Sequence, residues 1–245
     1  MYLHTSALVL NSEPLAEHDR LITLYTEKVG KIRAVCKGAR RLLSKINPHL
    51  RVGREIEAVL TRGREWWRLT SAQLTNSANS SSADFASEWQ ALQWYRFWGR
   101  VLKDEAAEQN VWQILQEFQQ EITADESASE LVYLAATLRL IGELGYAPRF
   151  QGCANCGVSV AGEENIFYAW QSGVICKACP KSAGTIFPLA VPKLCRYLVE
   201  TPRDGWQGKR LPISARDPLV KFLDNFLSYH FTEAYGSQFF IKENL

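Results

Sequence analysis

Four cysteines in two close pairs are the residues of this chain best suited to chemistry. The pairs are Cys153-Ala-Asn-Cys156 and Cys176-Lys-Ala-Cys179, with nineteen residues between them. In a Cys-x-x-Cys turn both sulfurs point to the same side, so two such turns supply the four tetrahedral thiolates that Zn²⁺ prefers. We expect one Zn²⁺ per chain at these four residues, with disulfide bonds and redox or iron–sulfur roles as the alternatives.

The ligand set predicts a structural zinc rather than a catalytic one. A catalytic site keeps one coordination position for water and has a general acid or base nearby, and four cysteines leave no such position. The four histidines are scattered, and the sequence contains neither the His-x-Glu motif of a zinc deaminase nor a Gly-x-x-x-x-Gly-Lys-Ser/Thr phosphate loop. We therefore expect no catalytic residue and no enzyme, with a zinc-dependent nucleic-acid enzyme as a less favoured alternative.

The rest of the sequence favours a reducing compartment. The N-terminus lacks the basic and apolar segments of a signal peptide, and no run of eighteen apolar residues could span a bilayer. The sequence thus predicts a cytoplasmic protein whose thiols stay reduced and available to a metal. The two other cysteines, Cys36 and Cys195, lie in apolar patterns and are expected in the core.

Charge is distributed unevenly along the chain, although the net charge is only +2. Residues 1–75 carry thirteen Lys and Arg residues against seven Asp and Glu residues, whereas residues 84–150 carry five against eleven. A basic N-terminal segment favours contact with a polyanion, and a solvated surface without a partner is the alternative.

The basic segment has the pattern of short strands. Apolar and polar residues alternate over 20–26, 31–37, 55–60 and 65–70, and an apolar run over 7–10 adds an opening strand. Five strands in about seventy residues predict a small closed barrel of the OB-fold type, with an SH3-like barrel as the alternative.

The third of these strands carries a row of cations. A period of two places Ile32, Ala34 and Cys36 on one face, and Lys31, Arg33, Val35 and Lys37 on the other. A basic loop with one glycine follows directly, and such a surface could follow the phosphates of a single strand; solubilising charges that protect a strand edge are the alternative. The predicted nucleic-acid contacts are Lys31, Arg33, Lys37, Arg40, Arg41, Lys45 and Arg51.

Aromatic side chains could add platforms on which bases stack. The candidates are Tyr25, Trp66 and Trp67. Adjacent tryptophans on a strand face opposite ways, so we expect one of Trp66 and Trp67 in the core.

The remainder of the chain is predicted to be helical. After a polar stretch at 75–82, apolar residues recur every three or four positions over 85–102, 111–122 and 131–144. Beyond the cysteines, Pro192 is expected to begin one helix, and Asp217 with Pro218 to begin the last.

These patterns together predict an α+β fold. An OB-fold barrel at residues 1–78 is followed by a helical domain at 84–245, which the zinc module at 150–182 interrupts. The simplest packing unites helices from both sides of the zinc module.

Two separated motifs resemble the RecO family of bacterial DNA repair and recombination mediators. The first is the strand–turn–strand segment from Arg20 to Arg41, and the second is Leu144-Gly-Tyr-Ala-Pro148 leading into Cys153-Ala-Asn-Cys-Gly157. The run from Gly173 to Cys179 also fits. The resemblance covers the whole chain; one departure is Leu42-Leu43, where many relatives are more polar and basic.

The resemblance implies a non-enzymatic function in DNA repair after DNA damage and in DNA recombination. It implies binding of single- and double-stranded DNA, annealing of complementary strands, and cooperation with RecR in loading RecA onto DNA coated by single-strand-binding protein in the bacterial cytoplasm, at the nucleoid. Carried over by motif, the DNA contacts are Arg33, Lys37, Arg40, Arg41 and Lys45. An OB-fold protein that binds RNA, and a protein-interaction scaffold, are the rival interpretations.

Overall fold

The computed structural model of the chain divides into two compact units, Met1–Ala128 and Ser129–Leu245. It describes residues 2–75, 85–124, 130–160, 165–201, 205, 209 and 211–235. All of the predicted linker 75–82 except Thr75 lies outside these residues.

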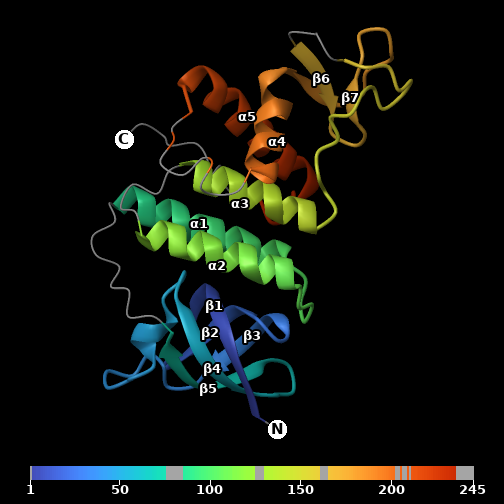
Figure 1. Ribbon diagram of the computed structural model, residues 1–245. Coiled ribbons are helices and arrows are strands. Elements are labelled where there is room, and N and C mark those ends of the chain that lie inside the picture. Colours follow the sequence, from blue (N-terminus) through green and yellow to red (C-terminus); the bar gives the residue numbers. More distant parts are fainter. Residues whose placement is uncertain are drawn as a thin grey trace. The chain divides into compact units, whose positions relative to one another are not determined.

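The first unit begins with a closed barrel of five strands (Figure 1). The strands are β1 (Tyr2–Leu15), β2 (Asp19–Thr26), β3 (Gly30–Cys36), β4 (Glu55–Thr61) and β5 (Trp67–Leu74), and a 3₁₀-helix, η1 (Asn47–Leu50), lies between β3 and β4. The strand order is β1-β2-β3-β5-β4, and only β3 and β5 pair in parallel. The predicted OB-fold barrel is confirmed, with an opening strand longer than expected.

The interior of the barrel is filled by apolar residues at alternate positions of its strands. On β3 these are Ile32, Ala34 and Cys36, each at most 2% exposed. The period of two therefore gave the inward face of β3 correctly, and Cys36 is a core residue as expected.

Two helices, α1 (Phe85–Val101) and α2 (Gln109–Ala124), belong to the same unit as the barrel. α1 lies against β1 and β2, and Gly99 permits this approach, since a Cβ there would lie only 3.3 Å from Cβ of Leu10. From α2, the Trp112 ring stacks on Tyr25 of β2 with 6.5 Å between centroids. Strand β2 is consequently buried on both faces, because the barrel interior covers one and the helices cover the other.

Among its described residues, the second unit contains three helices and a small sheet. The helices are α3 (Glu130–Glu143), α4 (Ala190–Glu200) and α5 (Ile213–His230), and the strands β6 (Asn165–Ala169), β7 (Gly173–Ile175) and β8 (Gly184–Pro188) form an antiparallel sheet in the order β7-β6-β8. α3 contacts α4, and α4 contacts α5. Helices from both sides of the cysteine segment thus pack together, as the sequence predicted.

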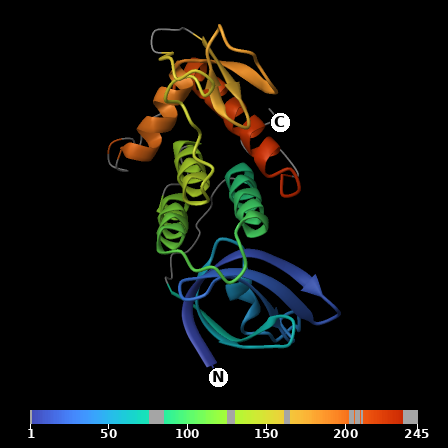
Figure 2. The same ribbon diagram turned by 90° about the vertical axis from the view of Figure 1, so that its right-hand side faces the viewer.

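Aromatic rings join the small sheet to α5, the red helix that lies beside the sheet in Figure 2. The Phe222 ring of α5 lies 5.1 Å from the rings of both Tyr168 and Phe187, which belong to β6 and β8. This aromatic core anchors the cysteine segment on the helices. The buried Cys195 of α4 belongs to the same unit and is a core residue, as expected.

The start of α5 differs from the sequence prediction. The helix begins at Ile213, so Pro218 lies inside it rather than in its first turn. The additional residues bring Arg216 to Glu130 at the start of α3, where the two side chains form an ion pair. The local sequence pattern suggested Asp217 as the N-cap because it carries no signature of a tertiary contact of this kind.

A carboxyl group is buried on α5. Tyr235 donates a hydrogen bond of 2.6 Å to Oδ1 of Asp224. The buried Oδ2 of Asp224 has no hydrogen-bond partner among the described residues. Burial raises the pKa of Asp224 to about 6, and the hydrogen bond from Tyr235 opposes part of that rise.

Within the described residues, no helix combines the length and the apolar character needed to cross a membrane.

Candidate nucleic-acid interface and metal site

The basic loop after β3 is fixed by the turn between β1 and β2. The backbone N–H of Gly38 donates to Oδ1 of Asp19 over 2.8 Å, and the N–H of Arg40 donates to the carbonyl of His18 over 2.8 Å. The guanidinium of Arg40 also donates to the carbonyl of Ala16 over 3.0 Å. Gly38 has φ +67°, a left-handed conformation that glycine adopts without strain. The start of the loop therefore has a defined position on the barrel.

Six of the seven predicted contact residues have exposed side chains on β3 and the segment that follows it. They are Arg33, Lys37, Arg40, Arg41, Lys45 and Arg51, and together we call them the β3 basic surface. None of the six forms an ion pair with another residue that the structure describes. Their charges are therefore available to an external anion.

Lys31, the seventh residue, does not lie on this exposed surface. Its side chain is 9% exposed, and its Nζ lies 3.1 Å from Oδ1 of Asp104 in the connection between α1 and α2. The alternation placed Lys31 on the outer face correctly, but that face is covered there by the connection. Covering by a segment distant in sequence is invisible to a local period.

The three candidate aromatic platforms also have different surroundings. Tyr25 is 2% exposed, and its Oη contacts the backbone of Ala106 and Glu108, so it is not available to a base. Trp67 is partly buried and packs against the barrel core, as expected for one of the two tryptophans. Trp66 is partly exposed.

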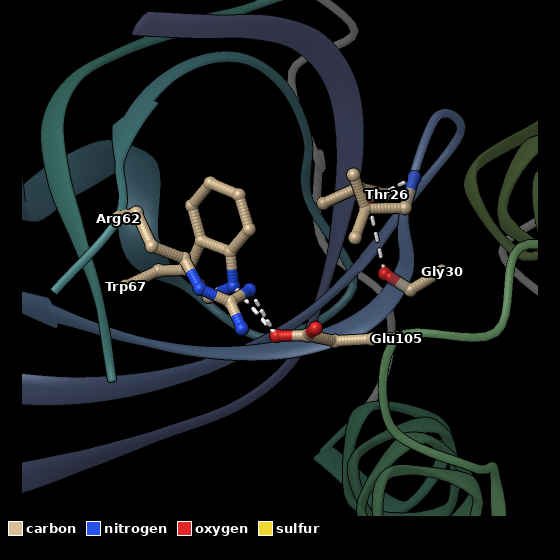
Figure 3. Close-up of polar contacts among 6 residues, drawn as sticks. Thr26, Gly30, Arg62, Trp67 and Glu105 are labelled. Carbon is tan, nitrogen blue, oxygen red and sulfur yellow. Dashed lines mark hydrogen bonds and ion pairs between the residues drawn. The ribbon is translucent and has the colours of Figure 1, made fainter. Parts of the chain in front are cut away.

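Glu105 is a residue that the sequence prediction missed. Figure 3 shows its carboxylate at the polar ends of two side chains from the β4–β5 region, Arg62 and Trp67. Arg62 forms an ion pair with Glu105, and Nε1 of Trp67 donates to the same carboxylate oxygen over 3.1 Å. Hydrogen bonds from Arg62 and then Trp67 lower the pKa of Glu105. The available signal was the acidic run Asp104-Glu105 in a unit whose barrel is basic.

The tip of the basic loop is apolar. Leu42 is 99% exposed and Leu43 is 90% exposed, so neither side chain packs on its own barrel. Single exposed leucines are ordinary, but two adjacent ones between cations form a distinct tip.

The four paired cysteines come together in the second unit. Their Sγ atoms all lie within 4.8 Å of one another, and those of Cys156 and Cys176 are 3.7 Å apart. Four sulfurs at about 2.3 Å from a tetrahedral metal would be about 3.8 Å apart. The cluster could therefore hold a metal ion with little rearrangement, and it is the one such group in the described part of the chain.

Backbone hydrogen bonds position the two cysteine pairs. The N–H of Ala154 donates to the carbonyl of Val174 in β7 over 2.8 Å, which connects the first pair to the strand that leads into the second. The N–H of Gly157 donates to the carbonyl of Cys153 over 2.8 Å, and Gly157 has φ +74°. The first turn is thus tied to β7 by a backbone hydrogen bond and the second follows β7 directly, so their positions do not depend on side chains alone.

The electrostatics of the cluster fit a cation. Hydrogen bonds with the backbone, foremost that of Cys176, lower the pKa of the Cys153 thiol to about 6. Hydrogen bonds with the sulfurs of Cys156 and Cys176 raise the pKa of Cys179 to about 12. One thiolate among the four therefore opposes ionisation of the others, and a divalent cation would remove this conflict.

Comparison with known proteins agrees with both parts of the fold. Residues 1–78 match the family described as Recombination protein O N terminal, and residues 99–238 match the family described as Recombination protein O C terminal. A DNA repair protein RecO of Caldanaerobacter subterraneus subsp. tengcongensis is 24% identical over 98% of this chain and 97% of its own length. One of Nocardioides sp. is 31% identical over 73% of this chain and 75% of its own, and one of Frankia casuarinae is 29% identical over 82% of each.

Proposed function

Because this chain belongs to the recombination protein O (RecO) family of DNA repair proteins, we propose that it binds single- and double-stranded DNA through the β3 basic surface and anneals complementary strands. The observation that carries the proposal is the set of six exposed cations without ion pairs among the described residues. Lys31 is left out of this surface, because it is buried beside Asp104.

Annealing needs no reacting side chain. Two DNA strands repel each other, and a cationic surface lowers the barrier to their approach by neutralising phosphates and releasing counterions. Arg33 and Lys37 on β3, with Arg40 and Arg41 in the loop, would contact phosphates and leave the base edges free to pair. The proposed activity is therefore independent of base sequence and non-enzymatic.

The cysteine cluster has a separate structural role in this proposal. Zn²⁺ bound by Cys153, Cys156, Cys176 and Cys179 would supply four metal–thiolate bonds that hold the two turns together. The contact of Ala154 with β7 and the packing of β6 on α5 would carry that stabilisation into the helices. The predicted domain bounds, 1–78 and 84–245 with the module at 150–182, belong to the same proposal.

We extend the proposal to the partners that the resemblance to the family implies. We include RecR, single-strand-binding protein and, indirectly, RecA in the proposal, with a location at the nucleoid. DNA coated by single-strand-binding protein would be the substrate on which the β3 basic surface acts.

A strand-annealing assay tests the proposal directly. Two complementary labelled oligonucleotides would be mixed with the protein, with and without single-strand-binding protein, and their pairing followed by fluorescence. We expect the wild-type protein to accelerate annealing, and the double variant Arg40→Glu/Arg41→Glu to lose at least about tenfold in DNA affinity. The loss should be uniform across DNA sequences. The slope of log affinity against log salt concentration should become shallower by the amount expected for about two phosphate contacts.

A matched control separates this surface from net charge. Lys193 and Lys221 are exposed on α4 and α5, and their double charge reversal changes the net charge by the same amount. Affinity unchanged by Arg40→Glu/Arg41→Glu would exclude the loop as the site. A preference for RNA without annealing of DNA would support the RNA-binding alternative instead.

A further inference from the structure

A second group of side chains in the first unit has the chemistry of a nucleic-acid contact, yet an acidic residue of the chain occupies it. The guanidinium carbon of Arg62 lies 4.9 Å from the ring centroid of Trp67, and both side chains donate to the Glu105 carboxylate (Figure 3). A guanidinium and an indole N–H that donate to one anionic oxygen are also suited to a phosphate oxygen of DNA.

The carboxylate reaches this position because the connection between α1 and α2 crosses the barrel. The N–H of Glu105 donates to the carbonyl of Lys31 over 2.8 Å, and Lys31 and Asp104 form an isolated parallel bridge. Glu105 has φ +52°, a left-handed conformation that costs a non-glycine residue about 1–2 kcal/mol. Its neighbours hold it in this conformation, with its carboxylate on Arg62.

The contact at Glu105 is nevertheless open to solvent. The side chain of Arg62 is 61% exposed and that of Glu105 is 42% exposed. Exposed ion pairs of this kind contribute little net stability, because water and salt compete with them. A polyanion held nearby by other cations can therefore replace the carboxylate.

The position also continues the β3 basic surface. Trp67 is paired with Ala34, and the exposed Arg68 is paired with Val35, where β5 runs parallel to β3. Arg68 thus lies on the strand beside Arg33 and Lys37. A strand bound along β3 would meet Arg68 on the neighbouring strand, one residue from Trp67, whose indole N–H reaches the Glu105 carboxylate.

The geometry points to the Arg62 guanidinium and the Trp67 indole N–H as a subsite for one phosphate group of single-stranded DNA, which the Glu105 carboxylate occupies until DNA displaces it. A carboxylate and a phosphate present the same kind of anionic oxygen to a guanidinium and an indole N–H. The inference rests on the proposed function, since the β3 basic surface must first bring the strand to the barrel. Glu105 then opposes binding, and its removal should strengthen it.

The test compares the affinity of variants for a short single-stranded oligonucleotide by fluorescence anisotropy over a series of salt concentrations. Glu105→Gln should bind the oligonucleotide about threefold to tenfold more tightly than the wild type. The slope of log affinity against log salt concentration should become steeper by the amount expected for about one phosphate contact. Arg62→Gln should bind no more tightly than the wild type. In the double variant Arg62→Gln/Glu105→Gln the gain should vanish, because the freed cation is missing.

Two further variants keep the test decisive. Glu65→Gln removes the same charge from an exposed residue of the β4–β5 loop, so an equal gain there would show a general charge effect and overturn the subsite. Glu105→Asn retains a residue type that tolerates a left-handed conformation, and it should reproduce the gain if Glu105→Gln fails to fold.

The two proposals fail in different ways. If the wild-type protein binds no DNA at low salt, the proposed function is wrong. If the wild type binds DNA and neither Glu105→Gln nor Glu105→Asn binds more tightly, only the Arg62–Trp67 subsite is wrong.

Discussion

The two units differ in where they place their polar side chains. In the unit Met1–Ala128, six cations face solvent on β3 and the segment after it, and none of the six pairs with a described residue. In the unit Ser129–Leu245, four thiols converge on one point and the carboxyl of Asp224 is buried. Charges left unpaired at a surface are available to a partner, whereas polar groups turned inward stabilise the chain itself only if something satisfies them.

The cysteine cluster should give the largest effect on stability. Replacing Cys176 with Ser removes one metal ligand, and we expect the second unit to lose about 4 kcal/mol or more, because structural metal binding contributes directly to folding free energy. Thermal unfolding by circular dichroism and metal content by mass spectrometry would measure both changes. Ala154→Ser, in the same turn, is the control and should change neither. Unchanged metal content and melting temperature in Cys176→Ser would contradict a metal site. If Cys176→Ser stayed stable and lost only DNA binding, the cysteine cluster would have a role in DNA binding and not only in stability.

Gly30 tests the barrel side of the comparison. Gly30 has φ +77°, and a Cβ there would lie 2.1 Å from the carbonyl oxygen of Ala106, so Gly30→Ala should cost about 3 kcal/mol through backbone strain and overlap. Gly38→Ala is a matched control, because its φ is +67° and the atoms nearest to its Cβ would be those of the Arg41 side chain, at 3.5 Å or more. Its cost should be about 1 kcal/mol. Chemical denaturation measures both, and equal losses would show that the α1–α2 connection does not hold the barrel tightly.

Asp224 predicts a dependence on pH in the second unit. Its folded pKa of about 6 lies above that of an unfolded aspartate, so the folded state binds the proton more tightly. The unit should lose about 2 kcal/mol as the pH rises from about 4 to above 6, and should become more stable as the pH falls through this range. Unfolding measured across this range would show the slope, and Asp224→Asn should flatten it. Tyr235→Phe should move the loss to higher pH, since it removes the hydrogen bond that lowers the pKa of Asp224. A slope unchanged in Asp224→Asn would assign the dependence to another group.

The apolar loop tip should give the smallest effect. Leu42→Ser/Leu43→Ser alters only exposed side chains, so the free energy of unfolding should stay within about 0.5 kcal/mol of the wild type. If the loop contacts phosphates alone, DNA affinity should also stay within about twofold. A larger loss of affinity at constant stability would show that the tip contacts bases.

Much of this fold was accessible from local patterns. The five strands follow from alternation, the helices from apolar spacing, and the metal cluster from the distance between the cysteine pairs, because each signal lies within a short stretch of chain. The inward face of β3 was assigned correctly for the same reason.

The errors share one physical cause. Lys31 and Tyr25 were expected at the surface, but the α1–α2 connection and α2 cover them. Glu105 was missed because its role depends on Arg62 and Trp67, which are about forty residues earlier in the sequence. Covering and pairing of distant segments are decided by tertiary packing, and a single sequence carries only a faint trace of them, such as the apolar residues at both odd and even positions of β2.

The packing of α1 on β1 and β2 has a consequence for synthesis. The strands leave the ribosome before the helices, and until α1 and α2 follow, Leu10 and Tyr25 on the outer face have no cover. We expect a nascent chain that ends near residue 78 to remain aggregation-prone, and a chain that extends through about residue 128 to fold. The two helices thus cover the apolar outer face of the barrel before the barrel can bind any DNA.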